Sequence, residues 1–164
     1  MTAPQFEGDQ SAYPFHLYPY PSIVLTDGRG ANLPWLQEAP DPMTTARWGT
    51  WVELNPVTAA SLGVSDDDVV RVISPYGQLE APVVVYPGIR PDVVAIPVGQ
   101  GHRDYGRFAE RRGSNPLALV APVTDPATGA LAWGATRVRL EPTGRKQTLA
   151  RLESLEGAGR ETLG

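Results

Sequence analysis

The segment between residues 49 and 101 constrains the fold most strongly, because short strand-length runs alternate there with turn residues. The run Trp51–Leu54 has the pattern of a strand and is followed directly by Asn55-Pro56. An asparagine can cap the free N–H groups of a helix, and proline fits its first position, so this pair predicts a short helix. Gly63 then predicts the end of that helix. Further strands are predicted at 69–74, 79–86 and 93–97, with turns at Tyr76-Gly77 and Pro87-Gly88.

This order of strand, helix, strand, hairpin and strand predicts a mainly β protein, a compact barrel with short helices. Upstream, 15–21 is predicted as an edge segment or extended arm because proline cannot donate to a strand ladder. The run 22–26 is predicted as the first barrel strand, 33–38 as a helical turn, and 135–141 as the last strand. The predicted organisation is an N-terminal arm at 1–21, a barrel at 22–141, and a C-terminal tail or linker to a further domain at 142–164.

Composition excludes several kinds of chemistry. The chain has no cysteine, so it cannot itself ligate an iron–sulfur cluster or use a thiol nucleophile. Its two histidines, His16 and His102, have no third metal ligand at a recognisable spacing. No catalytic motif is present, and catalytic residues are therefore not assigned. A net charge of −4 gives no reason to expect a nucleic-acid partner.

Three loops contain the residues best suited to hold a ligand. Glycines in the first two allow a backbone to approach a ligand closely, and an arginine offers a planar fork for phosphate. An amide in the third could recognise a purine or pterin edge. The candidate binding residues are Thr26, Gly28, Arg29, Gly30 and Asn32 in the first loop, Gln100, Gly101 and His102 in the second, and Ser114 and Asn115 in the third.

Each loop also has a purely structural interpretation. The first could be an ordinary turn with a solvated Arg29, and the second a turn with an exposed His102. Asn115 precedes a proline and could act only as the N-cap of a short helix at about 116–120. The four arginines between 103 and 112 could meet a pyrophosphate or an acidic partner, or could simply form a solvated surface.

The series Trp51–Pro56, Asp68–Val72, Tyr76-Gly77, Ile89–Pro91 and Ala95–Pro97 resembles the molybdopterin dinucleotide-binding domain of the dimethyl sulfoxide reductase superfamily. The resemblance covers about residues 22–141. It implies a double-psi β-barrel that covers one half of a bis-molybdopterin guanine dinucleotide, within a molybdenum oxidoreductase involved in electron transfer. It also implies that the three loops contact the cofactor and that the domain alone is inactive.

The segments 27–38 and 99–107 resemble one branch of the superfamily. This is the molybdopterin-like, iron–sulfur subunit of alternative complex III, which is related to polysulfide reductase. The branch implies a subunit on the periplasmic face of a membrane-associated quinol-oxidising complex, with iron–sulfur and membrane subunits as partners. In that branch the cofactor is thought to be missing, so two expectations stand together: a domain that binds cofactor and a domain that only supports structure.

Two positions depart from the family pattern, since Asp67 and Asp92 stand where the family often has glycine. Aspartate tolerates a positive φ better than most residues, so the turns are expected to survive. A third alternative is an unrelated barrel module of the decarboxylase or chaperone type, although the chain shows no nucleophile or processing site.

Overall fold

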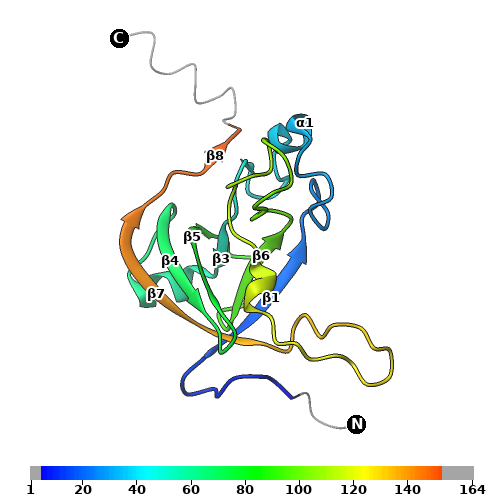
Figure 1. Ribbon diagram of the computed structural model, residues 1–164. Helices are drawn as coiled ribbons and strands as arrows, with labels where there is room; N and C mark the ends of the chain where they lie inside the picture. Colours follow the sequence, from blue (N-terminus) through cyan, green and yellow to red (C-terminus); the bar gives the residue numbers. More distant parts are fainter. Residues whose placement is uncertain (1–4, 153–164) are drawn as a thin grey trace, which may run out of the picture.

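The computed structural model describes residues 5–152, and six strands form its central ring (Figure 1). Around the ring the order is β1-β6-β3-β5-β4-β7, and β7 closes it by pairing with β1. These strands are β1 (Phe15–Pro21), β3 (Val52–Leu54), β4 (Asp68–Ile73), β5 (Gln78–Val85), β6 (Val93–Val98) and β7 (Arg137–Lys146). The pairs β1·β6 and β3·β5 are parallel, and the others are antiparallel. The predicted mainly β fold is confirmed, while the double-psi connectivity stays a prediction.

The core fills the inside of this ring with branched aliphatic side chains. Alternate residues of a strand face the same side, and the inward positions of β3 and β4 are fully buried. The main apolar cluster includes Leu17, Val52, Leu54, Val70, Val72, Val83, Val94, Ile96, Leu119 and Val138.

The first strand is β1, so the prediction of a first barrel strand at 22–26 is wrong. Those residues form a turn, and 15–21 is not an edge but pairs with β6 along its length. The N–H groups of His16 and Ser22 donate toward β6, whereas that of Leu17 donates to Thr136 on the opposite side. Successive N–H groups alternate sides, so Pro19 and Pro21 fall where the missing N–H would point away from β6. Both prolines therefore leave the parallel ladder intact.

The connection from β3 into α2 (Pro56–Leu62) confirms the predicted cap. The Asn55 side chain accepts a hydrogen bond from the Val57 N–H at 2.9 Å, and Gly63 ends the helix in the left-handed region with φ 67°. Asp67 also has a positive φ, of 67°, which confirms that aspartate carries this turn without glycine. Asp92 has no such conformation.

The later elements follow the prediction closely, with three differences. The segment after Asn115 is a 3-10 helix, η1 (Pro116–Leu119), and β7 continues to Lys146 instead of ending at 141. A small second sheet pairs β2 (Ala46–Arg47) with β8 (Ala150–Arg151), which the sequence did not predict. The part of the predicted tail at 153–164 lies outside the described residues.

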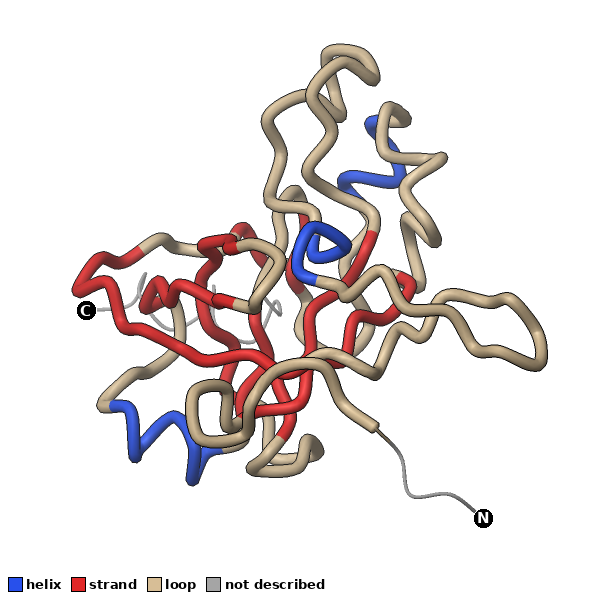
Figure 2. The backbone as a smooth tube through the Cα atoms, turned by 60° about the horizontal axis from the view of Figure 1, so that its bottom comes forward, coloured by secondary structure: helices blue, strands red, loops and turns tan. Residues whose placement is uncertain are grey.

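Long connections gather beyond one end of the ring (Figure 2). The segment with α1 (Pro34–Glu38) lies there beside the loop that follows β6, and Figure 1 shows the same neighbourhood. Among the described residues, no helix is both long and apolar enough to cross a membrane.

Candidate functional site

The three predicted ligand loops lie against one another at this end of the ring. A Cβ placed on Gly28 would come within 2.8 Å of the His102 Nε2, which puts the first loop against the second. A Cβ on Gly101 would come within 2.3 Å of the Asn115 backbone nitrogen, which puts the second loop against the third. Both glycines have a positive φ, so each supplies a close approach and a conformation that other residues rarely adopt. The three loops therefore converge at this end of the ring.

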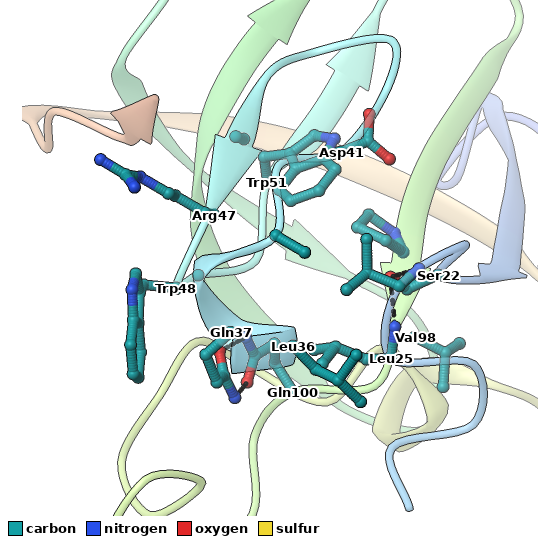
Figure 3. A pocket seen from close by; sticks show the side chains of 15 residues that line it. Ser22, Leu25, Leu36, Gln37, Asp41, Arg47, Trp48, Trp51, Val98 and Gln100 are labelled. Atoms are coloured by element: carbon teal, nitrogen blue, oxygen red, sulfur yellow. Dashed lines mark hydrogen bonds between the residues drawn. The ribbon is translucent and has the colours of Figure 1, made fainter. Parts of the chain in front are cut away.

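A buried pair of glutamine side chains holds the second loop in place (Figure 3). Gln100 donates from Nε2 to the Gln37 Oε1 at 2.7 Å, and Gln37 donates to the Gln100 Oε1 at 3.1 Å. Gln37 also donates to the Ala31 carbonyl at 2.8 Å, so it joins the first and second loops. Both polar atoms of the Gln100 amide are therefore used in hydrogen bonds inside the protein. Sequence reasoning missed Gln37, because a five-residue helix has too few turns to mark which polar residue is buried.

Two other candidates in the first loop also have partners within the chain. Arg29 pairs with the Asp27 carboxylate at 2.7 Å and is otherwise solvent-exposed. This guanidinium holds the pKa of Asp27 well below its usual range. The Asn32 Oδ1 accepts from the Phe108 N–H at 3.1 Å, which ties the first loop to the arginine-rich segment. Gly30 is packed against Leu36, and Thr26 is exposed with a φ of 54°.

In the third loop, Asn115 caps a short helix, as the structural interpretation of this loop predicted. The Asn115 Oδ1 accepts from the Leu117 N–H at 3.0 Å and so caps η1. Ser114 donates its N–H to the Thr50 hydroxyl at 3.0 Å and its own hydroxyl to the Glu80 carbonyl at 3.1 Å. Ser114 thus anchors the loop to Thr50 and to β5, whereas Asn115 caps η1 and remains exposed at the surface.

His102 differs from these residues because its Nε2 is buried and has no hydrogen-bond partner among the described residues. Its ring stacks on Tyr105 with centroids 4.8 Å apart and an interplanar angle of 26°. The Tyr105 hydroxyl donates to the Arg29 carbonyl at 2.9 Å, which fixes this ring pair over the first loop. An unpaired buried polar atom of this kind calls for an explanation, and a ligand can supply one.

The arginine-rich segment 103–112 lies at the same place. Its residues are joined to the first two loops through the Phe108 N–H and through the Gly101 N–H, which donates to the Arg112 carbonyl at 2.7 Å. Arg103, Arg107, Arg111 and Arg112 are exposed and have no ion pair with a described carboxylate. Arg107 lies over the Phe108 ring and Arg112 over the Trp48 ring. A group of uncompensated guanidinium groups suits a phosphate ligand.

The site can hold a cofactor only at its surface. The cavity in Figure 3, which the Gln37–Gln100 pair helps to line, has a volume of about 20 Å³, enough for a single water molecule. A dinucleotide therefore fits the exposed arginines and the His102 edge, but not the interior. No group of three or more metal-ligating side chains occurs among residues 5–152.

Comparison with known proteins identifies the family. The family described as "Molydopterin dinucleotide binding domain" matches residues 25–136. The chain is 36% identical over 143 residues to the arsenate respiratory reductase molybdopterin-containing subunit ArrA of Shewanella sp. (strain ANA-3), an alignment that covers 82% of this chain and 17% of that protein. It is 31% identical over 134 residues to the menaquinone reductase, molybdopterin-binding-like subunit of Nitratidesulfovibrio vulgaris, which covers 79% of this chain and 19% of that protein.

A solved structure shares the fold. Acetylene hydratase from Pelobacter acetylenicus matches with a TM-score of 0.61 at 16% identity, over 87% of this chain and 21% of that one. The chain thus spans about a fifth of the length of the relatives it matches. On the family match over residues 25–136, the chain belongs to the molybdopterin dinucleotide-binding domain family.

Proposed function

We propose that this chain binds the guanine dinucleotide part of a molybdopterin cofactor within an oxidoreductase subunit involved in electron transfer, and that it is not catalytic alone. The observation that carries the proposal is the convergence of three loops beside uncompensated arginines. A bound cofactor would supply the metal centre for the redox reaction. This chain would supply binding and orientation.

The residues divide this task according to their contacts. Arg103, Arg107 and Arg111 are free to meet the pyrophosphate, since they are exposed and have no described ion-pair partner. The His102 Nε2 is buried against Gly28 without a partner among the described residues, so a ligand would reach it only if the first loop moved aside. Gln100, Asn32 and Asn115 act chiefly by holding the loops in their positions.

Titration of the 164-residue chain with guanosine diphosphate, followed by calorimetry or amide chemical shifts, tests this proposal. We expect saturable binding that weakens about tenfold in Arg111→Gln, because one charge-assisted contact to phosphate is lost. Arg90→Gln is the matched control, since Arg90 is equally exposed but pairs with Asp92. Cytidine diphosphate separates recognition of guanine from recognition of pyrophosphate. Absence of binding, or equal weakening in both variants, would contradict the proposal.

A second candidate function is a cofactor-free structural domain. We infer it from the internal contacts of Arg29, Asn32 and Asn115, each of which already has a partner in this chain. One relative is itself described as a molybdopterin-binding-like subunit of a menaquinone reductase. On this proposal the domain supports a quinol-oxidising complex at the periplasmic face of a membrane, together with iron–sulfur and membrane subunits.

Analysis of the native protein with its partners separates the two candidates. Molybdenum or tungsten together with an extractable guanine nucleotide favours the cofactor-binding domain. A complex that transfers electrons but contains neither would favour the structural domain.

A further inference from the structure

A second pocket lies between β1, β3 and the turn after β5. It has a volume of about 300 Å³. Aromatic and aliphatic side chains form most of its wall, and two acidic side chains also line it. We call it the carboxylate pocket and define it by Tyr18, Tyr20, Asp41, Met43, Glu53 and Ile89.

Glu53 is 8% exposed, in the middle of a strand that pairs on both sides. Its Oε1 accepts hydrogen bonds from the Tyr20 hydroxyl and from the Trp51 Nε1–H, the second at 3.0 Å. Its Oε2 has no hydrogen-bond partner in the part of the chain that the structure describes. One half of this carboxylate is therefore left for a donor from outside.

Asp41 is 6% exposed and has the same asymmetry. Its Oδ1 accepts from the N–H groups of Met43 and Thr44 at 3.0 and 2.9 Å and from the Thr44 hydroxyl at 3.0 Å. Within residues 5–152 its Oδ2 accepts no hydrogen bond, and neither Asp41 nor Glu53 forms an ion pair. Neither free oxygen is fully buried, so both stay open to the pocket. A positive group that enters the pocket can therefore reach two carboxylates whose other oxygens are already held by the protein.

The walls indicate which cation fits. The Tyr18 and Tyr20 rings stack with centroids 6.1 Å apart and an interplanar angle of 22°. Tyr18, Ile23 and Met43 are each more than half exposed, so apolar surface surrounds the mouth of the pocket. A guanidinium is flat, packs on aromatic faces and donates up to five hydrogen bonds, whereas an ammonium is compact and strongly hydrated.

We propose that the carboxylate pocket receives an arginine side chain from an adjoining protein surface, with the guanidinium between Glu53 and Asp41 and its stem against the tyrosines. This inference rests on the proposed function in one respect: if the chain is a domain of a larger subunit, another protein surface adjoins it and can supply the arginine. The site itself lies on different residues from the three loops, and its test involves no nucleotide.

The test uses N-acetyl-L-arginine amide as the probe and the 164-residue chain as the receptor. The indole N–H signal of Trp51 reports on the pocket, because this group donates to Glu53. We expect the probe to shift that signal saturably at millimolar concentration. N-acetyl-L-citrulline amide, which has the same shape without the charge, should bind at least about tenfold more weakly.

Two conservative variants make the test specific. Glu53→Gln and Asp41→Asn keep the oxygen that accepts the internal hydrogen bonds and remove the charge. Each should weaken arginine binding about tenfold, while Glu110→Gln, an exposed carboxyl on another loop, should not change it. Equal affinity for citrulline, binding retained in both pocket variants, or no shift of the Trp51 signal would overturn the proposal. Because no pterin or nucleotide is used, any of these results leaves the cofactor-binding proposal standing.

Discussion

Replacement of Gln37 by leucine tests whether the buried amide pair holds the candidate loops together. Gln37 is 1% exposed and Gln100 is 6% exposed, so neither amide can turn to water when its partner is lost. Gln37→Leu leaves three polar groups without partners: the Ala31 carbonyl and both polar atoms of the Gln100 amide. Each buried unsatisfied group costs about 1–3 kcal/mol, and partial relaxation makes about 3 kcal/mol the expected loss in the free energy of unfolding.

The double variant Gln37→Leu/Gln100→Leu gives the sharper result. It removes both amides and leaves only the Ala31 carbonyl unpaired. Its free energy of unfolding should therefore fall by about 1–2 kcal/mol, less than that of Gln37→Leu alone. Urea unfolding followed by tryptophan fluorescence measures Gln37→Leu, Gln100→Leu and the double variant, provided that the slope with denaturant stays constant. Gln78→Leu, at an exposed strand position, is the control and should change stability by less than about 0.5 kcal/mol. If the double variant lost the sum of the two single losses, the amides would not be acting as a pair.

Three further predictions concern single positions, each measured by chemical denaturation. Gly101→Ala should lower the free energy of unfolding by at least about 2 kcal/mol more than Gly129→Ala does, because both glycines have a positive φ but only Gly101 has backbone within 3 Å of the new Cβ. Equal losses would mean that the loops can move apart at little cost. Asn55→Ala should lose about 1–2 kcal/mol, since it removes a cap and a second hydrogen bond, while Asn55→Asp should keep the cap. Burial and the nearby Arg137 lower the pKa of His16 below 6.5, so the unfolded chain binds its proton first. Stability should therefore fall as pH drops below 6.5 toward the folded-state pKa, and His16→Phe should flatten this part of the profile.

Most strands follow from local pattern, whereas the start of the barrel does not. Val93–Val98 and Val52–Leu54 are rich in branched residues and lie between turn signals, so their positions are predictable. Phe15–Pro21 contains prolines, which argue against a paired strand. The missing N–H groups of these prolines point away from β6 only in the register that β1 adopts when it pairs with β6. Tertiary pairing thus decides what local composition leaves open.

The candidate site shows the same division. Its three loops are recognisable from their glycines, because close backbone approach restricts the residue type. The work of individual side chains is not recognisable, since the partner of Gln100 lies 63 residues away and that of Asn32 lies 76 residues away. The carboxylate pocket could not be predicted from the sequence either. Glutamate is usually a surface residue, and nothing in the local sequence shows that Glu53 lies in a strand buried on both faces.

The closure of the ring has a consequence for biosynthesis. β1 pairs with β6 and β7, so the first strand of the ring to be synthesised finds its partners only after residues 93–98 and 137–138 have also emerged. Until then its tyrosines and Leu17 stay uncovered, and the nascent chain is open to premature association with other polypeptides. Slow or interrupted translation between residues 21 and 93 is therefore expected to lower the yield of native protein, and a chaperone that shields the emerging first strand to restore it.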